Sequence, residues 1–82
     1  MQSVDQVQAS RPLPTLRLGS KGDDVKYLQE ALNYHGYTVT VDSIFGKKTE
    51  AAVKQFQKSR KLTVDGIVGQ KTWKELIGEY GC

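Results

Sequence analysis

Apolar residues recur every three or four positions in three separate stretches of the chain. The first stretch, about 23–35, places Val25, Leu28 and Leu32 on one face, with Ala31 beside them. This period is typical of an amphipathic helix that buries a single face. The pattern therefore predicts a first helix over these residues.

The residues at both ends of this helix suit the ends of a helix. Gly19 and Gly22 favour a turn, and Asp23 and Asp24 follow directly. Their carboxylates can cap the first turn and interact with the positive end of the helix dipole. Gly36 ends the pattern and is expected to form the C-terminal cap.

Two more helices are predicted by the same spacing, over about 47–60 and about 70–79. Between them, and in the aromatic and branched segment 37–41, we expect short extended loops that lie across the helices. The fold class predicted is all-α, a compact three-helix bundle. The expected inner faces are Thr49, Ala52, Val53 and Phe56 in the second helix and Thr72, Trp73, Leu76, Ile77 and Tyr80 in the third.

A ten-residue motif precedes each of these two helices. TVDSIFGKKT at 40–49 returns as TVDGIVGQKT at 63–72, with seven identical positions. The Asp can fold its carboxylate onto the backbone two residues later, and the later Gly permits a tight entry into the helix. We expect the Ile of each copy to point inward and the Thr to face the core. The equivalent pairs are Asp42 and Asp65, Ile44 and Ile67, Gly46 and Gly69, and Thr49 and Thr72.

A glutamine next to the apolar face is also repeated. Leu28 and Gln29 in the first helix are matched by Phe56 and Gln57 in the second. An amide offers both a donor and an acceptor, so each glutamine can satisfy backbone groups of an irregular loop, although direct ligand binding is an alternative. The repeats together indicate an internal duplication of a helix and a loop.

Length and composition indicate one small globular domain. The 82 residues are 38% hydrophobic and 26% charged, with a net charge of +3. Residues 1–15 end in RPLPT and read as a tail or linker, so we place the domain at 16–80 and a short tail at 81–82. We find neither a signal peptide nor a membrane segment, and expect no membrane insertion.

Candidate catalytic chemistry is sparse. A single histidine, His35, and a single cysteine, Cys82, do not support a zinc site or a Cys/His pair, and no calcium or phosphate loop is evident. His35 is expected to pack or to cap its helix. We therefore predict no metal, no cofactor and no catalysis. Tyr27 and Tyr34, seven residues apart on one side of the first helix, either stack on a sugar or peptide or pack at the core edge.

Three segments resemble the peptidoglycan-binding domain family. They are LRLGSKGDDVKYLQEALNYHGY, VDSIFGKKTEAAVKQFQ and LTVDGIVGQKTWKEL, which together cover about 16–77. The resemblance implies a three-helix module with an internal duplication that targets an attached cell-wall enzyme, such as an amidase, carboxypeptidase or endolysin, to its substrate. It implies a monomer that acts at the cell wall, in the periplasm or outside the cell.

The sequence departs from the family pattern at two positions. Ser43 stands where a Gly is frequent, which suits the turn only if the backbone there is not strongly left-handed. His35 stands where a Leu is common and is expected to expose the end of the first helix slightly more.

The ligand is expected to be the glycan strand or the stem peptide of peptidoglycan. If the two repeat loops approach each other, they form a shallow cleft, with Asp42 and Asp65 holding its walls and Tyr37 or Phe45 offering a stacking face. Its predicted lining is Tyr37, Ser43, Phe45, Gln57 and Val68.

Two other functions are alternatives to peptidoglycan binding. A nucleic-acid binder is disfavoured because Glu50, Glu75 and Glu79 interrupt the two later helices and would face phosphates. A protein-interaction or regulatory pro-segment-like module remains the alternative, since exposed aromatic residues also mark protein contacts.

Overall fold

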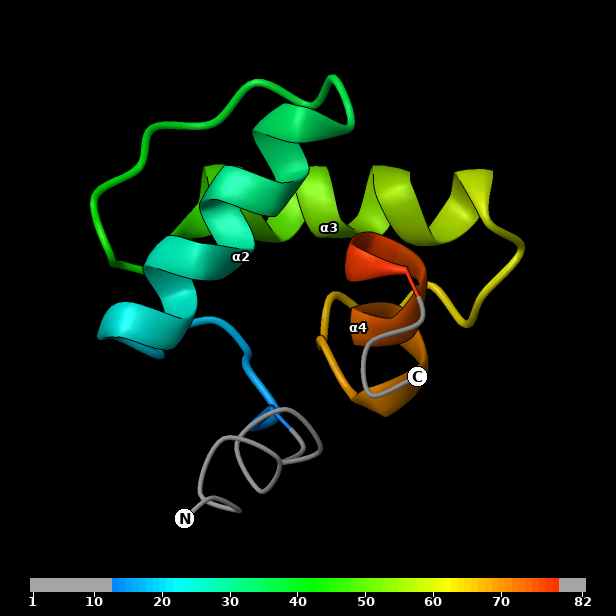
Figure 1. Ribbon diagram of the computed structural model, residues 1–82, viewed down its shortest axis with the longest axis horizontal. Coiled ribbons are helices and arrows are strands. Elements are labelled where there is room, and N and C mark those ends of the chain that lie inside the picture. Colours follow the sequence, from blue (N-terminus) through cyan, green and yellow to red (C-terminus); the bar gives the residue numbers. More distant parts are fainter. Residues whose placement is uncertain (1–12, 79–82) are drawn as a thin grey trace, which may run out of the picture.

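The protein, described over residues 13–78 by a computed structural model, contains three α-helices in that range (Figure 1). They are α2 (Asp23–Tyr34), α3 (Lys47–Ser59) and α4 (Gln70–Ile77). This part of the chain has isolated β-bridges but no strand. The predicted all-α, three-helix architecture is therefore confirmed. Of the predicted tails at 1–15 and 81–82, residues 1–12 and 81–82 lie outside the described residues, as does Tyr80.

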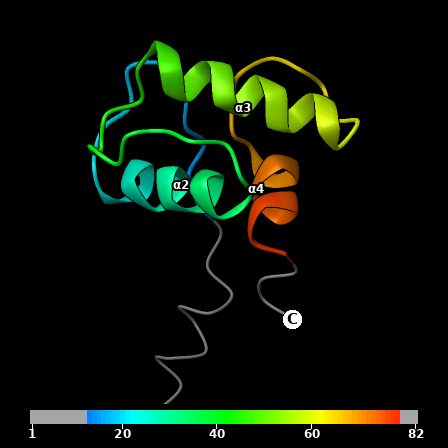
Figure 2. The same cartoon turned by 90° about the horizontal axis from the view of Figure 1, so that it is seen from above.

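Helix α2 is the element that packs against both of the others. Figures 1 and 2 show α2 alongside α3, with the shorter α4 against one end of the pair. The loop 35–46 carries the chain from the end of α2 back to the start of α3, and the loop 60–69 leads into α4. Residues 13–22 lie against both loops, through bridges from Leu16 to Val68 and from Lys21 to Ile44.

A single core fills the space between the three helices, and the predicted inner faces supply most of it. Val25, Val53, Phe56 and Trp73 are completely buried, while Ala31 lies at the edge of the core. Packing also extends N-terminal to Leu16, since Leu13 contacts the core. The buried apolar residues are Leu16, Val25, Leu28, Leu32, Val39, Phe45, Ala52, Val53, Phe56, Val68, Trp73 and Leu76.

The prediction that the loop isoleucines point inward was wrong. Ile44 is 49% exposed and Ile67 is only partly buried, whereas the next residues, Phe45 and Val68, are buried. Because successive side chains alternate in extended backbone, the inward position falls on the residue after the isoleucine. The isoleucines are held by their backbone groups.

The prediction that the aspartates of α2 cap the helix with their side chains was also wrong. The N-cap of α2 is Gly22, and neither Asp23 nor Asp24 makes a side-chain cap hydrogen bond. Their carboxylates lie in the first turn, where they still interact favourably with the helix dipole. Gly46 and Gly69 occupy the N-cap positions of α3 and α4, as the predicted helix entry requires.

The N-terminal segment connects the two repeat loops through backbone hydrogen bonds. Leu16 and Val68 exchange two bonds of 3.1 and 2.8 Å between N–H and carbonyl. Phe45, the equivalent of Val68 in the first loop, accepts from the Gly19 N–H at 2.9 Å and donates to the Ser20 carbonyl at 2.9 Å. Both loops are therefore anchored at the same position of their motif.

Ser43 has a left-handed backbone, with φ of 66°, close to the 74° of its equivalent, Gly66. Since a side chain is strained in this conformation, we predict that Ser43→Gly stabilises the protein by about 0.5–1 kcal/mol. The reverse change, Gly66→Ser, is expected to destabilise it more, because a Cβ there would lie 3.0 Å from Lys54 Cε and 3.1 Å from Glu50 Cγ. Urea unfolding of both variants checks this pair, and a destabilised Ser43→Gly protein would contradict it.

The helices within residues 13–78 include none whose length and apolar content would allow it to cross a bilayer.

Candidate functional site

Gln29 organises the first repeat loop from inside the core. Its side chain is fully buried, and its Nε2 donates to Asp42 Oδ1 at 3.0 Å, to the Ile44 carbonyl at 2.9 Å and to Thr49 Oγ1 at 3.2 Å. Its Oε1 accepts from the backbone N–H groups of Asp42 at 3.0 Å and Ser43 at 2.9 Å. Asp42 Oδ1 also accepts from the Ile44 N–H at 3.0 Å, which closes the expected Asx turn.

Gln57 repeats this network in the second loop. Its Nε2 donates to Asp65 Oδ1 at 3.0 Å, to the Ile67 carbonyl at 2.9 Å and to Thr72 Oγ1 at 3.2 Å. Its Oε1 accepts from the N–H groups of Asp65 at 3.1 Å and Gly66 at 3.0 Å. Asp65 Oδ1 accepts from the Ile67 N–H at 2.9 Å. The two aspartates thus occupy equivalent settings.

The two networks explain why the motif occurs twice. Each buried glutamine hydrogen-bonds the backbone of the irregular loop that enters the next helix, as the sequence suggested. Among the described residues, no buried side-chain N or O atom lacks a hydrogen-bond partner. With 1% exposure and both amide atoms engaged, Gln57 supports the loop from within and presents no free group to a ligand.

Both loop aspartates have a pKa below its ordinary value. The hydrogen bond from the Gln29 amide is the main cause that lowers the pKa of Asp42, followed by the Ile44 N–H. The Ile67 N–H is the main cause that lowers the pKa of Asp65. Donors that favour the ionised carboxylate stabilise the folded loop as long as the carboxylate stays charged.

The lowered pKa values of Asp42 and Asp65 predict that the folded protein loses stability in acid. A carboxyl whose folded pKa lies below its unfolded value of about 3.9 stabilises the fold above that value, and this stabilisation is lost as the pH falls through the folded pKa. The double variant Asp42→Asn and Asp65→Asn keeps the acceptor oxygens but not the charges. Its stability should change less than that of the wild type between neutral pH and about pH 2. Urea midpoints across this range test the prediction, and parallel curves would refute it.

The predicted ligand-binding residues do not form one cleft. Phe45, Gln57 and Val68 are buried, so the stacking face expected of Phe45 is not available at the surface. Tyr37 is half-buried, with its ring edge-to-face against Phe56 and its hydroxyl donating to Ser59 Oγ at 3.0 Å. Ser43, in the first loop, is partly exposed. Only Tyr37 and Ser43 are therefore placed to touch a ligand.

Each repeat loop instead borders a small hollow of its own. The hollow at the start of α3 has a volume of about 340 Å³, and that at the start of α4 about 280 Å³. Their linings are equivalent along the repeat, including Asp42 and Asp65 and the lysines Lys48 and Lys71. The duplication therefore produces two separate hollows with equivalent linings.

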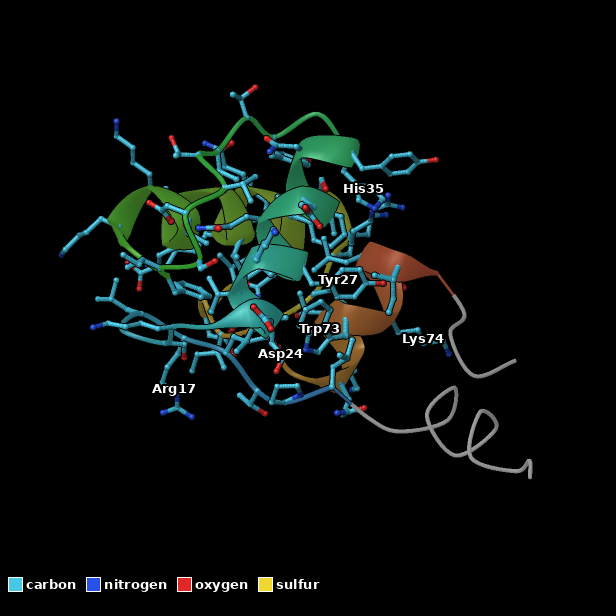
Figure 3. All side chains as sticks on the ribbon, turned by 60° about the vertical axis from the view of Figure 1, so that its left-hand side comes forward. Arg17, Asp24, Tyr27, His35, Trp73 and Lys74 are labelled. Carbon is cyan, nitrogen blue, oxygen red and sulfur yellow. The ribbon has the colours of Figure 1, made fainter. Side chains whose placement is uncertain are left out.

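A larger groove, of about 520 Å³, lies between α2 and α4. Its α2 wall contains Tyr27, Ala31 and Tyr34, and its α4 wall contains Leu76 and Ile77. Figure 3 shows Tyr27 extending from α2 toward α4, beside Trp73. The ring of Tyr27 stacks on the buried indole of Trp73 with centroids 5.7 Å apart, which fixes the ring although the side chain is 42% exposed. Tyr34 is 87% exposed.

His35 closes one end of this groove. Its Nε2 lies 2.6 Å from the carbonyl oxygen of Leu76, and its ring packs on Phe56. Because a carbonyl only accepts, Nε2 carries the proton, which leaves Nδ1 to accept from Arg60 Nη2 at 3.4 Å. The expectation that His35 packs or caps its helix is confirmed, since His35 is the C-cap residue of α2 and its ring joins α2 to α4.

Two charged residues of the groove could not be recognised from the sequence. Glu30 and Glu75 are exposed polar positions on α2 and α4, and nothing in the helical period distinguishes them from other surface residues. Their proximity depends on how the two helices pack. Among the described residues, no group of three or more His, Cys, Asp and Glu side chains is arranged to hold a metal ion.

Comparison with known proteins identifies the class to which this scaffold belongs. The family model of the peptidoglycan binding domain matches residues 21–76, which include both glutamine networks. The chain therefore belongs to the peptidoglycan-binding domain family.

Individual relatives carry the same unit within longer proteins. The chain is 43% identical over 63 residues to a spore cortex-lytic enzyme of Bacillus cereus, a match that covers 76% of this chain and 24% of that protein. The Burkholderia AP3 phage endolysin structure superposes with a TM-score of 0.78 and 46% identity, over 79% of this chain and 25% of the endolysin. The SleB N-terminal domain superposes with a TM-score of 0.76 and 41% identity, over 79% of this chain and 90% of that domain. This chain thus spans about a quarter of the length of the curated enzymes that it matches.

Proposed function

We propose that the protein is a non-catalytic module that binds peptidoglycan and holds an attached cell-wall hydrolase on its substrate. The observation that carries this proposal is the family match over residues 21–76, the stretch that contains both glutamine networks. The two networks keep the loops and the helix ends in fixed positions without any ligand. Such a preformed surface lowers the ordering cost of binding.

The relatives support the proposal that the module is attached to a cell-wall hydrolase. A spore cortex-lytic enzyme and a phage endolysin each contain a similar unit that makes up about a quarter of the protein. The remaining length of such proteins leaves room for a catalytic domain. We therefore place the working site of this protein at the cell wall, as part of or together with a hydrolase, with the glycan strand or the stem peptide as ligand.

A purely binding role is consistent with the groups on the surface. The polar residues of the two loops are engaged in fixing the backbone, and the described residues contain no candidate metal cluster. Tyr37 and Ser43 remain proposed contacts at the rim of the first loop. An open surface on a small domain suggests a Kd of about micromolar to millimolar, made effective by tethering or by repeated wall sites.

Retention on purified cell-wall sacculi tests the proposal. We predict that the folded chain cosediments with sacculi and that a soluble disaccharide-peptide fragment of the wall releases it. A reduction by salt alone, without release by the fragment, would indicate nonspecific attraction of the +3 chain and contradict the proposal. Failure to cosediment at all would favour the alternative of a protein-interaction or regulatory module.

A further inference from the structure

We propose that the groove between α2 and α4 binds a primary ammonium group on an aliphatic stem, as presented by the side chain of the diamino acid in peptidoglycan stem peptides. This proposal rests on the proposed function, because it assigns one chemical group of the wall to one place on the module. It gives a role to Glu30 and Glu75, which contribute nothing to the loop networks described above.

The charge of the groove differs from that of the rest of the protein. The chain carries a net charge of +3, and the hollow at each repeat loop contains at least one lysine. The part of the α2/α4 groove that the structure describes instead contains Glu30, Glu75 and His35, and no Lys or Arg. Neither carboxylate has an ion-pair partner among residues 13–78. An anionic site on a cationic protein selects a cationic ligand group.

The walls of the groove suit the rest of such a side chain. Ala31, Leu76 and Ile77 provide apolar surface that can cover methylene groups. Tyr27 and Tyr34 add two aromatic rings, and an ammonium over the face of an aromatic ring is attracted by its quadrupole. A methylene stem that ends in an ammonium group therefore matches both parts of the lining.

The groove is held in shape before any ligand arrives. Tyr27 is fixed by stacking on Trp73, whose Nε1 in turn donates to the Pro14 carbonyl at 2.8 Å. The contact of 2.6 Å between His35 Nε2 and the Leu76 carbonyl joins the end of α2 to α4. These contacts set the separation of the two walls without a ligand.

Acetylation of the free amines in sacculi separates this proposal from general electrostatics. Acetylation removes positive charge from the wall, so a nonspecific attraction to the +3 chain would become stronger. The proposed groove predicts the opposite, a decrease in affinity of about three- to tenfold, as expected for two exposed charge pairs with an aromatic contribution. The measurement is a cosedimentation isotherm of the full chain on untreated and acetylated sacculi.

A matched pair of variants assigns the effect to the groove. Glu30→Gln with Glu75→Gln removes both groove carboxylates, and Asp23→Asn with Glu50→Gln removes two carboxylates that do not line it. Each double variant raises the net charge equally, from +3 to +5. Only the groove variant is expected to bind untreated sacculi about three- to tenfold more weakly and to lose its sensitivity to acetylation.

The exposed ring of Tyr34 provides a test that does not change charge. Tyr34→Ala is expected to weaken binding to untreated sacculi by about threefold, whereas Val41→Ala, at an exposed apolar residue outside the groove, is expected to leave it unchanged.

The outcomes distinguish this proposal from the proposed function. If the wild type binds sacculi but acetylation leaves its affinity unchanged or increases it, the groove proposal is overturned and peptidoglycan binding stands. The same conclusion follows if both double variants behave alike. If the wild type does not bind sacculi at all, both proposals fail together.

Discussion

Replacement of Gln57 by leucine is expected to destabilise the protein by about 2–4 kcal/mol. The substitution keeps an apolar side chain of similar size but removes the partners of the Asp65 and Gly66 N–H groups and of the Ile67 carbonyl. A polar group left buried without a partner costs about 1–3 kcal/mol, and the Gly66 N–H is buried. For a small domain near the lower end of the usual 5–15 kcal/mol, this loss is a large share of the stability.

The matched control for this substitution is Gln55→Leu. Gln55 lies on the same helix but is exposed, so its replacement should change the free energy of unfolding by less than about 0.5 kcal/mol. Gln29→Leu is expected to resemble Gln57→Leu because its network is equivalent. Urea unfolding measures all three. Equal stabilities for Gln57→Leu and Gln55→Leu would mean that the buried network does not hold the loop.

Replacement of Trp73 by alanine is expected to have the largest effect, a loss of about 3–5 kcal/mol. Trp73 is completely buried and contacts three parts of the structure. It belongs to α4, it stacks on Tyr27 of α2, and its Nε1 donates to the Pro14 carbonyl at 2.8 Å. Its removal leaves a cavity and also removes one of the hydrogen bonds that hold the N-terminal segment. Thermal unfolding by circular dichroism is the measurement.

A second substitution of Trp73 separates packing from hydrogen bonding, and a substitution of Tyr34 serves as the control. Trp73→Phe keeps much of the apolar volume but cannot donate to Pro14, so its loss should be smaller than that of Trp73→Ala. Tyr34→Ala removes an aromatic ring that is 87% exposed and is expected to cost less than about 0.5 kcal/mol. A tryptophan variant as stable as Tyr34→Ala would contradict the central place of Trp73 in the core.

The helices were predictable because their signals are local. The three- and four-residue spacing of Val25, Leu28 and Leu32 gave the buried face of α2, and Gly36 fell just beyond its end. The repeated Asp, Gly and Thr of the decapeptide gave the Asx turns and the helix entries. Each of these features depends on residues a few positions apart, so one sequence is enough to recognise it.

The orientation of the loop side chains was harder to infer. The residues that the two motif copies share do not reveal that Gln29 and Gln57 bind the backbone of the isoleucines from inside. That contact turns Ile44 outward and Phe45 inward, which reverses the sequence-based prediction. The position of these loop side chains depends on a partner that is 15 residues away in the first loop and 10 residues away in the second.

The groove between α2 and α4 was not predictable for a related reason. Tyr27 and Tyr34 were recognised as a possible contact surface, but Glu30 and Glu75 lie on different helices. They line one groove only because α4 packs across the end of α2, where His35 bonds the Leu76 carbonyl. The five residues predicted to line one cleft failed as a set because three of them complete the core.

The duplicated loops and the groove have different roles in the module. The loop networks use buried amides to fix irregular backbone, which leaves the surface between α2 and α4 open for recognition. A nucleic-acid partner fits this surface poorly, since its two carboxylates would repel phosphates. The same carboxylates and aromatic rings fit a cationic group of the wall.

Titration of the isotopically labelled chain with a soluble disaccharide-tetrapeptide, followed by backbone amide chemical shifts, tests peptidoglycan binding most directly. We predict saturable shifts with a Kd of about micromolar to millimolar, concentrated on the facing residues of α2 and α4. The absence of any saturable shift, with the spectrum still that of a folded protein, would contradict the account.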